Sequence, residues 1–419
     1  MEKNLAETKR RANLSLIGAI LLIASVFGTY TTLSVYIGDM MGKYSCGLTE
    51  ITLIFSIASF TGILANFIVS AVIDKLPIKV ILGAGTIMTA LFFVFAGFSD
   101  SLILLYIGAG LFGLATNFAG FSTTQTIVSW WHAKNFGKKI SYLSMAMAIM
   151  GVVLGLILPR ILVSSGLKNT ILLQGGAITV IMLISSFFLV SDKPEKYGLK
   201  AYQAEELPES SAQGAATQTV PGLTFGDCLK TKQFWILAIV NAIAMIGCGW
   251  TNNISVIFQS KGLDSITAGT MMSVYSACGI AVTFIFGAIT DKIGGIKSTK
   301  LFIMLTAVAF AFGGVLAGMP GVIALAILAP VFNSYSGMIN ALTVGPVFGY
   351  KAFGKLLPIF NVAASVGVII GPVLASSMHE GSGSFNSFFF ALIGCTAVVY
   401  LLYIFLTSKK SVKQMQEKF

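Results

Sequence analysis

Polar and aromatic side chains stand inside long apolar stretches of this sequence, and they are its main candidates for chemistry. They supply amide, hydroxyl and indole groups but no fixed charge. Such groups can hold a small solute by hydrogen bonds and ring contacts. The pattern contains no Ser-His-Asp, metal-ligand or phosphate-loop constellation. The candidate binding residues are Tyr30, Asn117, Trp250, Asn252, Asn253, Tyr275, Asn333 and Asn361.

The stretch from Gly247 to Asn253 is the strongest local signal among them. It reads Gly-Cys-Gly-Trp-Thr-Asn-Asn, and two glycines with two asparagines loosen a helix and free backbone groups. Interrupted helices of this kind line solute sites in membrane carriers. The alternative is that the polar side chains only bond neighbouring helices together.

The ionisable residues avoid the apolar stretches. All 16 acidic residues fall in loops or at the ends of the stretches, as do His132 and His379. A buried proton relay is therefore not predicted, which favours exchange, facilitated diffusion, or coupling through protonation of the solute. An acid at a stretch end, Asp39 or Glu50, is the alternative proton carrier. The five cysteines lack C-x-x-C spacing, so we expect no disulfide framework, metal or cofactor.

The elements that position these residues are membrane-spanning helices. The chain of 419 residues is 56% hydrophobic and only 10% charged, against roughly 25% charged in a soluble chain. Apolar stretches bounded by charges and turn residues predict twelve spans of about 20 residues or more. They lie at 14–38, 51–73, 79–98, 102–130, 139–163, 169–191, 233–259, 265–289, 299–318, 321–349, 355–378 and 384–407.

The positions of the basic residues predict the orientation. Of the 27 Lys and Arg residues, all but Lys43, Arg160, Lys168 and Lys261 fall on one side of the predicted spans. This bias places both termini in the cytoplasm and indicates a multi-pass protein of the inner, cytoplasmic membrane. The net charge of +11 lies between the spans, so membrane lipid and not nucleic acid is the expected partner.

An internal repeat divides the chain. Asp74-Lys75 recurs as Asp291-Lys292, and Phe136-Gly137-Lys138 recurs as Phe353-Gly354-Lys355, each pair 217 residues apart. We therefore predict an all-α integral membrane protein with an N-terminal half at 1–191, a polar cytoplasmic linker at 192–232, and a C-terminal half at 233–419. Halves repeated in parallel are typical of secondary transporters.

The segment from Gly287 to Lys297 resembles the G-x-x-x-D-[RK]-x-G signature of the major facilitator superfamily. Its first copy, Ser70 to Pro77, has serine in place of the glycine. The resemblance covers essentially the whole chain and implies the twelve-helix major facilitator fold. It also implies that a small residue allows close helix packing and that the aspartates act in gating. The implied gating residues are Asp74, Lys75, Asp291, Lys292 and Gly287.

Two shorter segments resemble one branch of that superfamily. Lys230 to Leu237 is similar to the T-x-Q-F-W segment of oxalate/formate antiporter and monocarboxylate transporter relatives, and Ser129-Trp130-Trp131 is similar to their W-F segment. Relatives place an arginine and often a lysine where this chain has Thr283 and Asn361. Without those cations a dianion is disfavoured, and Thr283 joins the candidate binding residues.

We therefore predict a secondary transporter, without enzymatic activity, that acts as a monomer on a small organic monoanion. A proton or a counter-substrate is the expected coupled species, in symport or antiport. Efflux of neutral or amphipathic compounds is the alternative within transport. A membrane sensor is the alternative of another class, although the sequence carries no output domain.

Overall fold

Helices make up the secondary structure throughout the described chain, with one isolated bridge between His132 and Tyr202. The computed structural model describes residues 2–132, 136–202, 223–349 and 351–408. Helices are expected here because a span in lipid must bond its own backbone N–H and C=O groups. The predicted all-α membrane fold is confirmed. The Ser210–Thr219 stretch of the predicted linker lies outside the described residues.

Eleven helices within these ranges are long and apolar enough to cross a membrane. One of them, Lys138–Leu189, passes through Gly166, whose φ of +74° is not helical. Glycine adopts this conformation without the steric cost of a Cβ. The long helix therefore supplies two spans, in agreement with the twelve that the sequence predicts.

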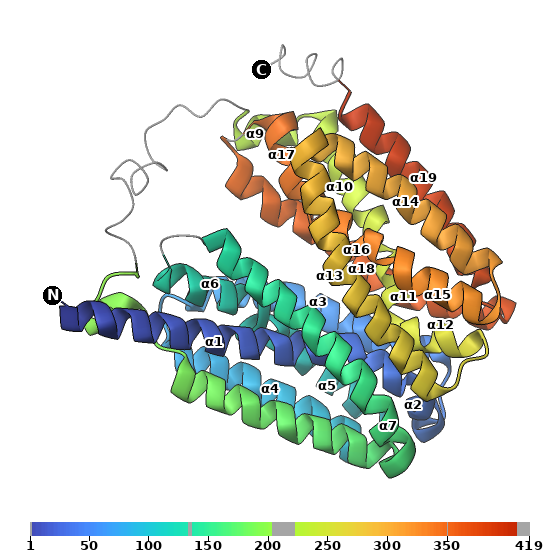
Figure 1. The fold of residues 1–419 in the computed structure, drawn as a ribbon, viewed down its shortest axis with the longest axis horizontal. Coiled ribbons are helices and arrows are strands. Elements are labelled where there is room, and N and C mark those ends of the chain that lie inside the picture. The colour runs from blue at the N-terminus through green and yellow to red at the C-terminus, as the bar shows by residue number, and fades with distance from the viewer. Residues whose placement is uncertain (1, 133–135, 203–222, 350, 409–419) are drawn as a thin grey trace. The chain divides into compact units, whose positions relative to one another are not determined.

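The first unit contains residues 1–46 and 57–218. Figure 1 labels its helices. They are α1 (Glu2–Thr32), a 3-10 turn (Leu33–Tyr36), α2 (Ile37–Tyr44), most of α3 (Leu48–Val72), α4 (Ile78–Phe98), α5 (Leu102–Ala115), a π-helical turn (Thr116–Gly120), α6 (Phe121–Trp131), α7 (Phe136–Ile184), a π-helical turn (Ser185–Leu189) and a 3-10 turn (Pro194–Tyr197).

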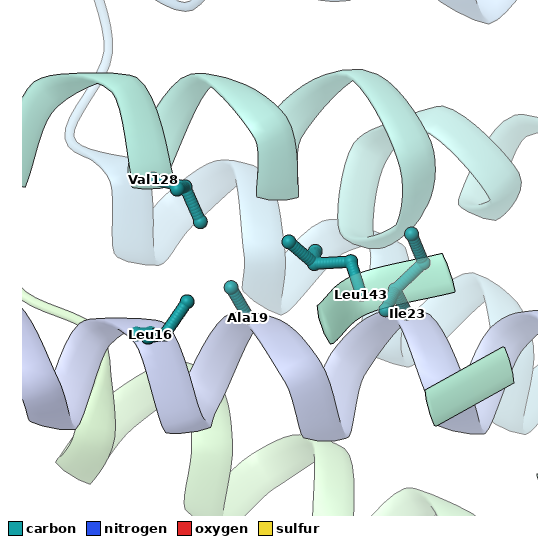
Figure 2. Packing of buried hydrophobic residues seen from close by; sticks show 5 residues of the cluster. All are labelled: Leu16, Ala19, Ile23, Val128 and Leu143. Atoms are coloured by element: carbon teal, nitrogen blue, oxygen red, sulfur yellow. The ribbon is translucent and has the colours of Figure 1, made fainter. Parts of the chain in front are cut away.

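The core of the first unit lies where α1 meets α6 and α7. Leu16, Ala19 and Ile23 form one apolar face of α1 at helical spacing, and Val128 of α6 and Leu143 of α7 pack on it. Figure 2 shows these side chains directed into one space. At Ala19 the small side chain leaves room for its larger neighbours.

The second unit contains residues 47–56 and 219–419. Its helices are α9 (Phe225–Leu229), α10 (Lys232–Met245), α11 (Cys248–Asn252), α12 (Ile254–Ser260), α13 (Ser265–Ile293), α14 (Gly295–Val315), α15 (Gly318–Leu328), α16 (Pro330–Ser336), α17 (Ile339–Phe348), α18 (Phe353–Ser382) and α19 (Asn386–Leu406).

The first turns of α3 group with the second unit, although the predicted halves place them in the first. The backbone N–H of Thr49 donates to Glu380 Oε1 at 3.0 Å, and the hydroxyls of Thr52 and Ser376 are 2.8 Å apart. Both partners belong to α18. These bonds explain why residues 47–56 belong to the second unit.

Helix interruptions recur in the two units. The break that follows Thr32 corresponds, 217 residues later, to the break around Trp250, and Gly120 corresponds in the same way to Gly337. The repeat seen in two short motifs thus extends to the places where spans 1, 4, 7 and 10 stop being regular α-helix. Such interruptions expose backbone groups that intact helices would use internally.

Candidate functional site

The interruption predicted in the seventh span is confirmed. The span consists of α10, α11 and α12, which are separated at Ile246–Gly247 and at Asn253. Asn253 is fully buried, and its Nδ2 donates to the carbonyl of Gly249 at 2.9 Å and to that of Pro372 at 3.4 Å. Asn253 therefore ties the interrupted helix to α18, and its amide nitrogen is used within the protein.

Two glycines allow this contact between α11 and α18. A Cβ added at Gly249 would lie 2.1 Å from the carbonyl oxygen of Gly371, and one added at Gly371 would lie 2.5 Å from that of Ile246. No side chain fits in either place. The glycines of the eleventh span thus serve close helix packing, as in other membrane helix pairs.

Trp250, Tyr275 and Asn333 form one group. The rings of Trp250 and Tyr275 meet edge to face, with centroids 5.1 Å apart at 87°, and Asn333 Nδ2 donates to the Tyr275 hydroxyl oxygen at 2.6 Å. Because that oxygen accepts, the Tyr275 hydroxyl hydrogen is available to donate elsewhere. Asn333 itself is exposed.

Two buried donors of α11 have no acceptor among the residues the structure describes. Trp250 is fully buried and Asn252 is 7% exposed, yet Trp250 Nε1 and Asn252 Nδ2 make no hydrogen bond there. An unpaired buried donor costs about 1–3 kcal/mol. Unpaired donors beside an interrupted helix are typical of a site that a ligand completes.

Thr283 extends the group along α13. It lies about two turns from Tyr275, and its hydroxyl is 3.4 Å from that of Ser334, the neighbour of Asn333 on α16. Tyr275, Thr283, Asn333 and Ser334 thus form a polar strip between α13 and α16, called the α13–α16 strip below. Ser334 is a member that sequence reasoning missed, and its place beside Asn333 in the sequence was the available signal.

Asn361 lies apart from this strip in a separate polar pair. Asn340 Nδ2 of α17 donates to Asn361 Oδ1 of α18 at 3.1 Å. Thr283 and Asn361, which replace the cations of the resembling branch, therefore both have neutral polar partners. Neither of them adds charge to the second unit.

The first unit holds Asn117 in the π-helical turn at Thr116–Gly120. Its Nδ2 donates to the carbonyl of Gly62 at 2.8 Å, which directs Oδ1 toward Ser122, 2.8 Å away. Ser122 also lies 2.8 Å from the side-chain amide of Asn66. Its single hydroxyl hydrogen can serve only one acceptor, so the hydrogen-bond pattern assigns the Asn66 amide nitrogen to this contact.

Tyr30 forms a second polar point in the first unit. Its hydroxyl is 3.2 Å from that of Ser59, and its ring stacks on Phe112 with centroids 6.5 Å apart. Ser59 and Ser122 were not among the predicted site residues. The π-helical turn that presents Asn117 and Ser122 carries no charge or proline that would reveal it in the sequence.

The predicted gating residues lie at the ends of spans on the side rich in Lys and Arg. Asp74 follows α3, is 73% exposed, and pairs with Lys193 at 2.5 Å. Lys75 beside it is exposed. The neighbouring helix N-terminus, at Ile78, is capped instead by Asp192 Oδ1 at 2.9 Å.

The second copy of the motif closes α13. Asp291 and Lys292 are exposed in the last turn, and Gly294, with a φ of +85°, ends the helix. A Cβ added at Gly287 would meet no atom within 4 Å in the described structure. The close packing that the motif implies for Gly287 is thus not formed within the second unit.

Among the described residues no three His, Cys, Asp or Glu side chains are grouped as metal ligands. The α13–α16 strip and the Asn66–Asn117–Ser122 group contain only neutral polar side chains. Together they offer hydrogen bonds and aromatic faces to a solute, with little means of balancing more than one ligand charge.

Comparison with known proteins gives a family match over most of the chain. The family described as Major Facilitator Superfamily matches residues 18–352. The uncharacterized MFS-type transporter YhjX of Escherichia coli (strain K12) is 25% identical over 364 residues, which cover 85% of this chain and 83% of YhjX. The hexuronate transporter of Bacillus subtilis (strain 168) is 22% identical over 354 residues, which cover 81% and 82% of the two chains.

Solved structures give the same fold. The nucleoside transporter NupG superimposes with a TM-score of 0.71 at 14% identity, covering 95% of this chain and 100% of NupG. A bacterial homologue of the human lysosomal transporter Spinster superimposes with a TM-score of 0.68 at 15% identity, covering 98% of each chain. At these identities the likeness concerns the fold alone.

Proposed function

The chain belongs to the major facilitator superfamily and transports small solutes, and from this premise we propose that its solute is an organic monoanion. In this proposal the solute crosses the cytoplasmic membrane by alternating access, with both chain termini in the cytoplasm. The branch of oxalate/formate and monocarboxylate carriers, which the sequence resembles, is the proposed relationship within the superfamily.

One observation carries the choice of a monoanion. Trp250 Nε1 and Asn252 Nδ2 are buried donors without acceptors, beside the Tyr275 hydroxyl. A carboxylate oxygen accepts hydrogen bonds from neutral donors and would offset the cost of leaving them unpaired. A second ligand charge would need a cation, and the positions of Thr283 and Asn361 supply none.

The relatives are compatible with this chemistry. A hexuronate, the solute named for the Bacillus subtilis relative, carries one carboxylate and several hydroxyl groups. The amide groups of Asn333, Asn117 and Asn66 could serve such hydroxyls as donors and acceptors. Coupling would then use a counter-substrate or protonation of the solute itself, because the α13–α16 strip has no acid.

Ligand-induced stabilisation of the purified protein tests the proposal. A solute that binds the folded state raises the melting temperature, so we expect formate, lactate or a hexuronate to raise it more than oxalate or a nucleoside. Trp250→Phe and Tyr275→Phe should abolish the shift. Tyr400→Phe, the same change in α19 of the second unit, should retain it. Stabilisation by nucleosides alone would replace the monoanion with a neutral solute.

Uptake into proteoliposomes is the second measurement. The stabilising solute should accumulate or exchange in vesicles that contain the protein, and Tyr275→Phe should reduce the rate at least tenfold, which corresponds to about 1.4 kcal/mol. Stabilisation by a monoanion without any flux would contradict carrier function while leaving the binding site in place.

A further inference from the structure

The beginning of the predicted linker is an ordered part of the first unit. Residues 191–202, called the 191–202 clasp below, lie against the ends of α1, α4 and α6. Trp131 Nε1 donates to the carbonyl of Ser191 at 3.4 Å, and the N–H of Tyr202 donates to the carbonyl of Trp131 at 2.9 Å. Both ends of the clasp are thereby attached to the last residue of α6.

Aromatic and cationic contacts hold the middle of the clasp. The Arg11 guanidinium lies 4.0 Å above the Tyr197 ring, and that ring is 6.4 Å from the fully buried Trp131. Cation–π pairs of this geometry stabilise by about 0.5–1 kcal/mol at exposed sites. The segment between Ser191 and Tyr202 is therefore fixed on the unit by α1 as well as by α6.

Asp192 adds a polar attachment to α4. Its Oδ1 accepts the first free N–H of that helix, from Ile78, and its Oδ2 is 3.3 Å from Lys196. A carboxylate at a helix N-terminus is favoured by the unpaired N–H groups and the helix dipole. The role of helix cap beside the gating motif thus belongs to the clasp, and Asp74 is left for another partner.

That partner is Lys193. Its ammonium is 2.5 Å from Asp74 Oδ1 and lies 5.0 Å above the ring of Trp130, and its side chain is 32% exposed. Lys193 is held by the clasp, whereas Asp74 is 73% exposed in the short turn between α3 and α4. The aspartate is therefore the mobile member of the pair.

We propose that Lys193 is a gating residue: it holds Asp74 in the state described here and releases it in another state of the transport cycle. An exposed ion pair is weak, which suits a contact that forms and breaks in every cycle. The inference rests on the proposed alternating access, but it does not depend on which solute is carried.

Cysteine labelling tests this without a solute. Cys278, one turn from Tyr275 on α13, is kept as the only cysteine, and its reaction with an impermeant maleimide is timed in inside-out vesicles. We expect Lys193→Gln to change the labelling rate about two- to fivefold. Lys196→Gln, the matched loss of a lysine from the same clasp, should leave it unchanged.

A second background separates gating from local stability. In Asp74→Asn protein, Lys193→Gln should have no further effect, and exchanging the charges in Asp74→Lys/Lys193→Asp should restore the original labelling rate. An equal effect of Lys193→Gln in both backgrounds, or none in either, would overturn the proposal. Absence of transport for every solute in the presence of these labelling changes would instead contradict the proposed function.

Discussion

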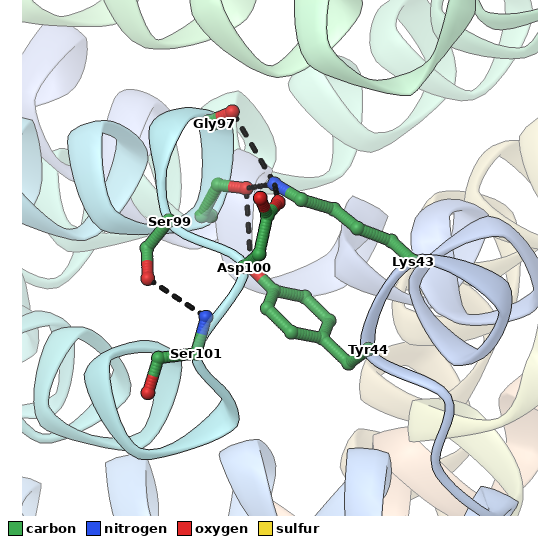
Figure 3. Close-up of polar contacts among 7 residues, drawn as sticks. Lys43, Tyr44, Gly97, Ser99, Asp100 and Ser101 are labelled. Carbon is green, nitrogen blue, oxygen red and sulfur yellow. Dashed lines mark hydrogen bonds and ion pairs between the residues drawn. The ribbon is translucent and has the colours of Figure 1, made fainter.

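Lys43 and Lys261 make the same contact in the two units. Lys43 Nζ donates to the carbonyl of Ala96 at 2.9 Å and to that of Gly97 at 3.3 Å, at the end of α4 (Figure 3). Lys261 Nζ donates to the carbonyls of Gly313 and Leu316 at 2.8 Å each, at the end of α14. Each ammonium thus meets the unpaired carbonyls and the negative end of a helix dipole.

These contacts predict that both lysines stabilise the fold. Hydrogen bonds to charged groups contribute about 1.5–3 kcal/mol, so Lys43→Met and Lys261→Met should each lower the melting temperature of the purified protein. Arg160→Met removes a cation from the same side of the spans and should change it little. Equal melting of all four proteins would show that the helix ends need no cation.

The buried pair of Tyr36 and Gln174 predicts a compensating double substitution. The Tyr36 hydroxyl donates to Gln174 Oε1 at 2.5 Å inside the first unit. Gln174→Leu leaves that hydroxyl without an acceptor, at a cost of about 1–3 kcal/mol. Adding Tyr36→Phe should recover most of the loss, because both polar groups are then absent. Thermal unfolding of the two single variants and the double variant measures the coupling; additive losses would contradict it.

The glycine contact between α11 and α18 predicts a large effect of one methyl group. Gly249→Ala and Gly371→Ala place a Cβ within 2.1 Å and 2.5 Å of carbonyl oxygens, so the helices must separate at a cost of 1–3 kcal/mol or more, roughly. Gly394→Ala in α19 meets no atom within 4 Å and is the control. Size-exclusion profiles and melting temperatures should distinguish them; intact folding of Gly249→Ala would refute the close approach.

His132 predicts a pH-dependent stability. Burial lowers the pKa of His132, and Lys139 lowers it further, while the bond to the Ala12 carbonyl acts the other way. The unfolded chain, with a histidine pKa of about 6.5, therefore takes up the proton first as the pH falls. The stability that neutral His132 contributes is complete above about pH 6.5 and is lost as the pH falls below it.

Melting curves at pH 7.5 and pH 5.5 test this expectation. The wild-type protein should lose more stability between the two values than His132→Gln, because the variant has no imidazole to protonate. An unchanged difference in the variant would assign the pH dependence to other groups.

The spans and their repeat were predictable because hydropathy and charge are averaged over many residues. The predicted span 265–289 corresponds to Ser265–Ile293 of α13, and 79–98 corresponds to Ile78–Phe98 of α4. The break near Trp250 was predicted from its glycines and asparagines. The break after Thr32 was not, although it stands 217 residues earlier in the repeat.

The site was less predictable, because hydrogen-bond partners depend on packing between helices. Composition identified Tyr275 and Asn333 as polar residues in spans but could not pair them. The bond between Tyr36 and Gln174 joins residues 138 positions apart, and a single glutamine in an apolar stretch gives no signal of its partner. Asp192 takes the helix-capping position because the linker folds back, which no local pattern in the sequence encodes.

The clasp also determines where the polypeptide can be divided. A cut after residue 191, the end of the predicted N-terminal half, would remove the cap of α4, the partner of Asp74 and the ring that stacks beneath Arg11. A cut after Tyr202 would keep all three with the helices they serve. Co-expression of two separate pieces, or insertion of a reporter protein between them, should therefore begin beyond Tyr202.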